Sequence, residues 1–278
     1  MAKILIADSG FTKTDWRLIQ ADGSIEQART AGINPYYQSE QEMLTVIKDL
    51  HSQIPDKIDE IYYYGTGCSS GTNRKKIADL LAKYYPSAQI DVNHDLLAAA
   101  RSLCGEEPGI ACIIGTGTNS CLYDGQKITH NVPSLGWAIA DEGGGTYLGK
   151  MLVTDYYRKD MPEHLRQIFK ETFGLTKDKF LTHIYQEPMP GRFLASFAKF
   201  IGQHIDEPYM YQLVANGFDT FITRNVMKYE GYDSLPVHFT GSVAYYFSNV
   251  LRQVAKDKGI FVKHISEYPI AGLTLFHQ

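Results

Sequence analysis

The sequence predicts an α/β protein made of two similar domains, and three observations support this. Residues 3–30 show the pattern strand, Gly/Thr turn, strand, Asp-Gly turn, strand, and residues 110–131 repeat it. Between these copies, further strands each lead into a helix, as in an α/β layer. Turn residues and charges cluster near 105–109. We therefore expect domains at 1–106 and 107–278, and the last helix can return to the first domain.

Composition narrows the functional class. The 278 residues suffice for two domains of roughly 150 residues each. A formal charge of −4 without any basic run argues against a nucleic-acid binder. The four cysteines form no C-x-x-C motif, so neither a zinc ribbon nor a thioredoxin motif is expected. No apolar run reaches the ~20 residues of a membrane span, and the short first strand is no signal peptide, so we expect a cytoplasmic protein without membrane contact.

The first hairpin combines a carboxylate with a small-residue turn. An apolar strand ends on Asp8, Ser9 and Gly10 can turn sharply, and Thr12 and Lys13 offer donors before the next strand at 14–19. Such a turn suits a phosphate chain with its metal ion. The alternative is an ordinary hairpin with a polar turn, in which Lys13 is simply solvated.

The rest of the first half alternates strands and helices. A hairpin turn at 21–24 leads to a strand at 25–30, and Ser39 with Glu42 forms a capping box at the start of a helix. A strand at 58–64 runs into a Gly-rich turn and a helix at about 73–85. That turn matches neither the Walker loop nor the dinucleotide fingerprint.

Asp95 follows the next strand, at 88–92, and precedes a helix at 96–103. A carboxylate at a strand end can orient and deprotonate a hydroxyl. The alternative is that Asp95 only caps the helix. His94 beside it is interpreted as a strand-end histidine without a catalytic role.

The second half begins with the repeated hairpin. A strand at 110–114 meets the turn Gly115-Thr116-Gly117, which offers a second phosphate-type turn. Asp141 and Glu142 then precede three glycines and a helix at about 146–157. Acids near a helix start interact well with its dipole. The three glycines indicate close approach of a ligand to the backbone.

The remaining residues are mostly helical. Helices are predicted at 163–173, 177–185, 191–204 and 209–229, with aromatic residues at core spacing and no chemistry. A strand at 235–240, the pair Gly241-Ser242, a helix at 243–258, a strand at 259–264 and a helix at 269–277 complete the chain.

The two hairpins at 8–16 and 113–121, with Thr240-Gly241-Ser242-Val243-Ala244 before a helix, resemble the phosphate-1, phosphate-2 and adenosine motifs of the actin-like ATPase superfamily. Within that superfamily the chain is most similar to the N-acetylglucosamine kinase group. The group's Gly-x-x-x-Gly-Asp-Glu-Gly-Ser signature appears as residues 136–144, with Ala140 replacing a glycine and Gly144 a serine. The resemblance implies two ribonuclease-H-like domains with a central cleft, mixed five-stranded sheets flanked by helices, and a helical insertion in the second domain.

The resemblance also implies an ATP-dependent kinase of an amino sugar, most closely N-acetylglucosamine at its 6-hydroxyl, that uses ATP and Mg²⁺. The implied nucleotide-binding residues are Asp8, Gly10, Thr12, Lys13, Gly115, Thr116, Gly117, Gly241 and Ser242, and Asp8 would order Mg²⁺ through water. Asp95 matches the catalytic base. The implied sugar-binding residues are Asn34, Gly67, Cys68, Asp95, Gly136 and Asp141, although Cys68 lies where the family has a serine. A sugar substrate and a homodimer are the implied partners.

Two alternatives remain open at this stage. The group is related to the ATPase activators of 2-hydroxyacyl-CoA dehydratases and benzoyl-CoA reductases, whose cysteines hold an iron–sulfur cluster between two subunits. A non-catalytic sugar- or nucleotide-binding member is the other alternative, against which the presence of Asp8 and Asp95 argues.

Overall fold

The computed structural model describes residues 2–10, 12–55 and 57–278. The chain divides into two compact units. Unit 1 comprises Met1–Glu107, Gly125–Lys127 and Tyr268–Gln278, and unit 2 comprises Pro108–Asp124 and Ile128–Glu267. No helix in the described part of the chain is long and apolar enough to span a membrane.

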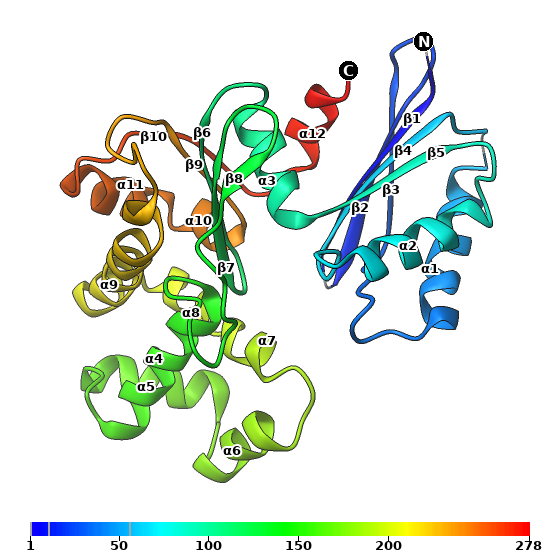
Figure 1. Cartoon of the computed structure of the whole chain (residues 1–278). Coiled ribbons are helices and arrows are strands. Elements are labelled where there is room, and N and C mark those ends of the chain that lie inside the picture. The colour runs from blue at the N-terminus through cyan, green and yellow to red at the C-terminus, as the bar shows by residue number, and fades with distance from the viewer. Residues whose placement is uncertain (1, 11, 56) are drawn as a thin grey trace. The chain divides into compact units, whose positions relative to one another are not determined.

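Unit 1 is a five-stranded mixed sheet with helices on both faces (Figure 1). Its strands are β1 (Ile4–Ser9), β2 (Lys13–Ile19), β3 (Ile25–Ala31), β4 (Glu60–Gly65) and β5 (Gln89–His94), in the order β3-β2-β1-β4-β5. β1, β2 and β3 pair antiparallel, whereas β4 and β5 continue parallel to β1. Its helices are α1 (Glu40–Gln53), α2 (Gly71–Ala82), α3 (Asp95–Cys104) and α12 (Ile270–Phe276).

Alternation along β1 divides the core of unit 1 between the two faces. Leu5 and Ala7 pack with α1 and α2, while Ile6 packs with α3 and α12. The expected capping box of α1 is confirmed: the Ser39 side chain accepts from the Glu42 amide, and the Glu42 carboxylate accepts from the Ser39 amide.

The last helix, α12, belongs to unit 1 and lies beside α3 (Figure 1). A Cβ at Gly272 would lie 2.2 Å from the Ser102 carbonyl oxygen, so only glycine allows this approach. Just after α12, the ring of His277 stacks on Tyr62 with 3.8 Å between centroids, and its Nε2 lies 2.9 Å from the Tyr64 hydroxyl. These contacts attach the end of the chain to the sheet of unit 1.

Unit 2 repeats the sheet of unit 1. Its strands are β6 (Gly109–Ile114), β7 (Thr118–Tyr123), β8 (Ile128–His130), β9 (Val237–Thr240) and β10 (Val262–Ser266), in the order β10-β9-β6-β7-β8. β6, β7 and β8 pair antiparallel, and β9 and β10 are parallel to β6. Read from β8, the order and directions are those of unit 1, so the sequence repeat is a repeat of the fold.

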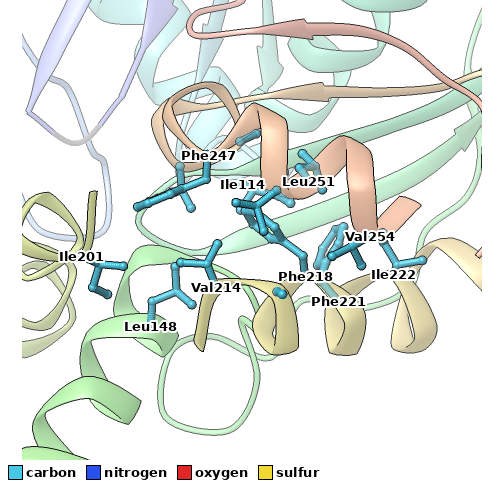
Figure 2. Close-up of a cluster of buried hydrophobic side chains, with 14 of the residues drawn as sticks. Ile114, Leu148, Ile201, Val214, Phe218, Phe221, Ile222, Phe247, Leu251 and Val254 are labelled. Atoms are coloured by element: carbon cyan, nitrogen blue, oxygen red, sulfur yellow. The ribbon is translucent and has the colours of Figure 1, made fainter. Parts of the chain in front are cut away.

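The helices of unit 2 include a long insertion between β8 and β9. They are α4 (Gly145–Arg158), α5 (Glu163–Phe173), α6 (Lys177–Tyr185), α7 (Pro190–Ala195), α8 (Ala198–Gln203), α9 (Pro208–Arg224), the 3₁₀ helix η1 (Val226–Lys228), α10 (Ser242–Tyr246) and α11 (Ser248–Asp257). Phe218 and Phe221 of α9, Leu251 of α11 and Ile114 of β6 meet in its core (Figure 2). Of the aromatic residues expected in the core, Phe197, Phe200, Phe218 and Phe221 are buried, and Phe193 packs partly buried against them.

Three predicted helices are shorter or divided. The helix expected at 191–204 is two helices that meet near Phe197, and the one expected at 243–258 divides at Phe247. Both phenylalanines are buried. No helix-breaking residue marks either place in the sequence, so tertiary packing of these rings decides the break. The helix expected at 209–229 ends at Arg224 and continues as η1.

Candidate functional site

Three strand ends lie side by side in unit 1. The register pairs Ser9 with Gly65 and Gly65 with His94, so Asp8, Thr66 and Asp95 gather where β1, β4 and β5 end. The carboxyl ends of parallel strands are where open α/β sheets bind ligands.

Asp8 faces two other carboxylates. Burial of its carboxyl and the negative charges of Asp15 and Asp95 raise its pKa to about 7, against the opposite effect of Lys13. Asp15 lies directly opposite Asp8 in the β1–β2 register. Like charges placed opposite each other are unfavourable, so Asp8 takes up a proton or a cation.

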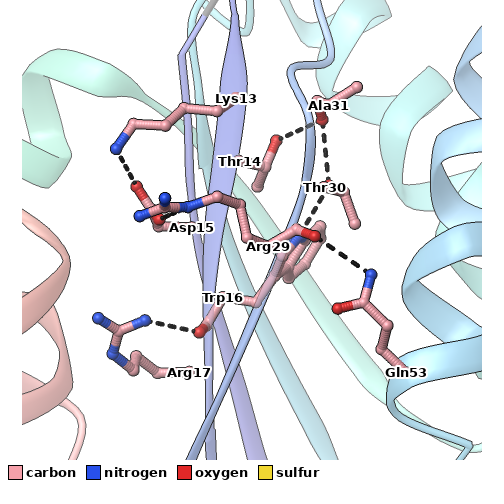
Figure 3. Close-up of polar contacts among 9 residues, drawn as sticks. All are labelled: Lys13, Thr14, Asp15, Trp16, Arg17, Arg29, Thr30, Ala31 and Gln53. Atoms are coloured by element: carbon pink, nitrogen blue, oxygen red, sulfur yellow. Dashed lines mark hydrogen bonds and ion pairs between the residues drawn. The ribbon is translucent and has the colours of Figure 1, made fainter.

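Asp15 itself remains ionised because two cations hold it (Figure 3). Lys13 Nζ lies 2.9 Å from one carboxylate oxygen, and Arg29 Nε donates to the other at 2.8 Å. Burial acts to raise the pKa of Asp15, but these hydrogen bonds and charges lower it overall. Lys13, expected to meet phosphate, here bonds Asp15 and lies 3.8 Å above the ring of Tyr268.

Asp95 is the first residue of α3, and its oxygens each accept one hydrogen bond. Oδ1 accepts from the Leu96 amide at 2.9 Å and Oδ2 from the Thr66 hydroxyl at 3.2 Å. Burial raises its pKa, and His94, Thr66 and the Leu96 amide partly offset this. The cap of α3 is instead His94, whose Nδ1 accepts from the Leu97 amide at 3.3 Å. Capping therefore does not account for Asp95.

The expected sugar loops of unit 1 contact each other. A Cβ at Gly67, where φ is +83°, would lie 2.9 Å from Asn34 Oδ1. Asn34 Oδ1 accepts from the Tyr36 amide, and the Gly67 carbonyl accepts from Asn73. The Cys68 thiol is buried in the apolar core of unit 1, so the sugar contact expected at this position stays a prediction for its main chain. Burial also raises the pKa of this thiol to about 12.

In unit 2, the second turn is enclosed by other segments of the chain. The amides of Gly145 and Thr146 donate to the carbonyls of Gly115 and Thr116 at 2.8 and 2.9 Å. A Cβ at Gly144 would lie 3.1 Å from the Thr116 oxygen. Gly143, Gly144 and Gly145 thus pack closely against the protein's own segments. The close approach of a ligand to these glycines stays a prediction.

Asp141 holds the same turn. Its backbone is left-handed, with φ +64°, and its Oδ1 accepts from the Thr118 amide at 3.2 Å and from the Ser134 hydroxyl at 3.4 Å. A Cβ at Gly117 would lie 2.6 Å from Asp141 Oδ2. Burial raises the pKa of Asp141, partly offset by the Thr118 amide and Ser134. Its neighbour Glu142 bonds Arg224 at 2.7 Å.

The expected adenosine motif reaches this turn as well. Gly241, with φ +114°, follows β9 and begins α10 at Ser242. A Cβ at Gly241 would lie 2.5 Å from the Ile114 carbonyl oxygen. The structure thus gathers Gly115, Thr116, Gly117, Asp141 and Gly241 in one part of unit 2. Gly136, with φ +77°, lies in the loop that precedes Asp141.

Two interacting residues of unit 1 were missed by the sequence analysis, although signals existed. The hairpin turn at 21–24 sets the β2–β3 register, which places Arg29 opposite Asp15. Thr66 follows β4, a neighbour of the strand that ends beside Asp95. In both cases, pairing the predicted strands would have predicted the contact.

Comparison with solved structures decides the family. The crystal structure of a candidate N-acetylglucosamine kinase from Porphyromonas gingivalis matches with a TM-score of 0.93 and 41% sequence identity, over 99% of this chain and 98% of the other. The chain belongs to the N-acetylglucosamine kinase group of the actin-like ATPase superfamily. It is thus a member of a family of ATP-dependent sugar kinases, as the sequence motifs predicted.

More distant structures share the fold of this N-acetylglucosamine kinase group member. A candidate N-acetylglucosamine kinase from Chromobacterium violaceum matches with a TM-score of 0.74 at 16% identity, over 100% of this chain and 99% of the other. A ROK hexokinase from Thermus thermophilus matches at 0.52 and 13% identity, over 99% and 98%. No protein-family profile and no curated protein sequence matches the chain.

Proposed function

We propose that the protein transfers the γ-phosphate of ATP to the 6-hydroxyl of N-acetylglucosamine or a related N-acetylated hexosamine, with Asp95 as the catalytic base. The observation that carries this proposal is that the carboxylates of Asp8 and Asp95 lie together at the strand ends of unit 1. The chain is also 41% identical to a candidate N-acetylglucosamine kinase. Among the described residues, Thr66 and Leu96 each donate one hydrogen bond to a different Asp95 oxygen, and lone pairs remain for a substrate proton. Its raised pKa strengthens it as a base.

Asp8 would order Mg²⁺ through bound water. The residues fit this ion, because a divalent cation would offset both the burial and the repulsion by Asp15 and Asp95 that raise the pKa of Asp8. In the described residues, no group of three or more His, Cys, Asp or Glu side chains could hold a metal ion. That suits Mg²⁺, which keeps several waters and binds through one or two carboxylates and substrate phosphates. When bound, Mg²⁺ would neutralise charge that develops on the phosphates.

The other assignments follow the family motifs. In unit 1, the Gly10–Thr12–Lys13 turn would bind phosphate oxygens, and Asn34 with the main chain at Gly67 and Cys68 would bind the sugar. In unit 2, Thr116 and Gly117 would bind phosphate, Gly241 and Ser242 the adenosine, and Gly136 and Asp141 the sugar. Lys13 would have to exchange Asp15 for phosphate. We also propose a homodimer, as the family resemblance implies.

The cysteines do not favour the iron–sulfur activator alternative. All four thiols are buried, and Cys68 and Cys112 belong to the apolar cores of their units. A cluster held between two subunits needs thiols at a surface.

The test is phosphate transfer from Mg-ATP to a sugar panel, measured against ATP hydrolysis without sugar. We expect transfer to N-acetylglucosamine above N-acetylmuramate, glucosamine and glucose, and none to the 6-deoxy analogue. Asp95→Asn should reduce kcat by about 10²–10⁴-fold while ATP still binds. Asp91→Asn is the matched control, because Asp91 lies exposed on the same strand. Full activity of Asp95→Asn would refute the base, and transfer to no sugar would refute the function.

A further inference from the structure

A cavity of about 450 Å³ lies in unit 2, among the end of α4, α5 and the loop into α6, outside the residues assigned above. Its lining includes Tyr156, Tyr157, Lys159, Arg166, Lys170 and Leu175. Small-molecule sites in proteins commonly measure ~300–1,000 Å³. The cavity is therefore large enough for an organic ligand rather than an ion alone.

All three charged residues that line the cavity are cations. In the described part of the chain, Lys159 and Lys170 make no ion pair. Arg166 pairs with Glu163, whose side chain is 75% exposed and lies outside the lining. Arg166 Nε is buried and has no hydrogen-bond partner. Because an unpaired buried donor is unfavourable, acceptor oxygens of a ligand would complete this site.

The helix ends at the cavity also affect its electrostatic potential, with opposite signs and smaller charges than the lining side chains. Thr176, which also lines it, is the N-cap of α6, so the positive end of that helix dipole lies nearby. The ends of α4 and α5 bring the negative ends of their dipoles. Each helix end is equivalent to about half a charge, so the charges of Lys159 and Lys170 alone exceed these contributions and the cavity favours an anion.

Two tyrosines form a fixed aromatic wall. The Tyr157 hydroxyl donates to the Leu175 carbonyl at 3.0 Å, and its ring contacts Phe180. The rings of Tyr156 and Tyr157 meet edge to face, 5.0 Å apart. Burial raises the pKa of Tyr157 to about 12, so its hydroxyl stays neutral and does not repel an anion. A rigid aromatic face suits the apolar face of a sugar ring.

We propose that this cavity binds a sugar phosphate, with the phosphate monoester on Lys159, Arg166 and Lys170 and the sugar ring against the tyrosines. The choice of a sugar rests on the proposed function, whereas the preference for an anion rests on the lining charges alone. The site is separate from the second turn, because α4 begins at that turn and its 14 residues extend about 21 Å to the cavity.

The test is calorimetric binding of three probes to the full chain: N-acetylglucosamine 6-phosphate, glucose 6-phosphate and inorganic phosphate. The double variant Lys159→Asn with Lys170→Gln removes two charges, and asparagine tolerates the left-handed backbone at position 159. Lys256→Gln is the matched control, an exposed lysine of α11 outside the cavity. Circular dichroism and thermal unfolding verify that each variant is folded.

We expect the double variant to weaken binding of a sugar phosphate at least tenfold and Lys256→Gln to leave it unchanged. Unchanged affinity in the double variant, or no probe bound by the wild type, would overturn the site. Equal affinity for inorganic phosphate and the sugar phosphates would overturn the role of the aromatic wall. Phosphate transfer measured on the same samples keeps the two proposals apart: its absence refutes the kinase function, while charge-dependent binding still supports the cavity.

Discussion

The two hairpins, β1–β2 and β6–β7, occupy the same place in two sheets of identical strand order. Different interactions determine their local structure. The first carries its charges within the strands, where Asp8 faces Asp15. The second hairpin has Ile114 opposite Thr118. The carboxylate that contacts it belongs to Asp141, which lies in a loop after β8. Electrostatics thus governs the hairpin of unit 1, and close backbone packing governs that of unit 2.

A Cβ added to Gly10 in the first turn, or to Gly241 beside the second turn, should show this difference most clearly. Gly241→Ala places a Cβ 2.5 Å from the Ile114 carbonyl oxygen at φ +114°, whereas a Cβ at Gly10 would lie 3.6 Å from the Lys13 carbonyl oxygen. We expect Gly241→Ala to lower the free energy of unfolding by about 3 kcal/mol or more, and Gly10→Ala by less than about 1 kcal/mol. Urea unfolding measures both, and equal losses would contradict the contrast.

Asp8→Asn tests the electrostatic effect of the buried carboxylate in the first hairpin. The folded-state pKa of Asp8 is about 7, above its ordinary 3.8, so this group stabilises the fold fully below pH 4 and that contribution is lost as pH rises to 7. At pH 8, without nucleotide, the variant should be more stable than the wild type by about 2 kcal/mol, and the gain should shrink toward pH 4. Unfolding curves across pH 4–8 check this, and a pH-independent difference would contradict it.

Asp141→Asn probes the hydrogen bonds that hold the second turn. Asparagine keeps the shape and tolerates the left-handed backbone, but loses the charge-assisted bond from the Thr118 amide. We expect a loss of about 1 kcal/mol in the free energy of unfolding. Asp233→Asn, at an exposed position between η1 and β9 of unit 2, provides a control for the charge change. If Asp141→Asn instead raised the free energy of unfolding, the charge of Asp141 would be destabilising overall.

Each unit also contains an ion pair between a buried acid and an exposed arginine. Substitution of these arginines should change the free energy of unfolding least. Asp15 and Glu142 are 7% and 10% exposed, and their partners Arg29 and Arg224 are 66% and 67% exposed. Arg29→Gln leaves Lys13 on Asp15, so we expect at most about 0.5 kcal/mol. Arg224→Gln removes the ion-pair partner of Glu142 and should cost about 1 kcal/mol. Thermal unfolding of both variants measures the difference, and the reverse order would be contrary to this reasoning.

The features that the sequence predicts are mostly local ones, and these include the charges of the first hairpin. The sheet repeat, the strand-end acids Asp8 and Asp95 and the capping box of α1 depend on local patterns, so they could be read directly. The interactions of Asp141 and Gly241 depend on contacts between segments distant along the chain, which no local pattern encodes. The Asp15–Arg29 pair lies between these cases, because it needed only the register of one predicted hairpin.

The return of α12 to unit 1 affects the order in which the protein can mature. Ile270 and Leu273 of α12 complete the core on Ile6 and Ala98, yet they leave the ribosome after all of unit 2. Until α12 is made, α3 alone covers this face of the first-made sheet, and the apolar residues that α12 would cover stay exposed. Unit 2, although made later, can close its core first. A nascent chain that stops before residue 270 would therefore lack part of the core in the unit that is made first.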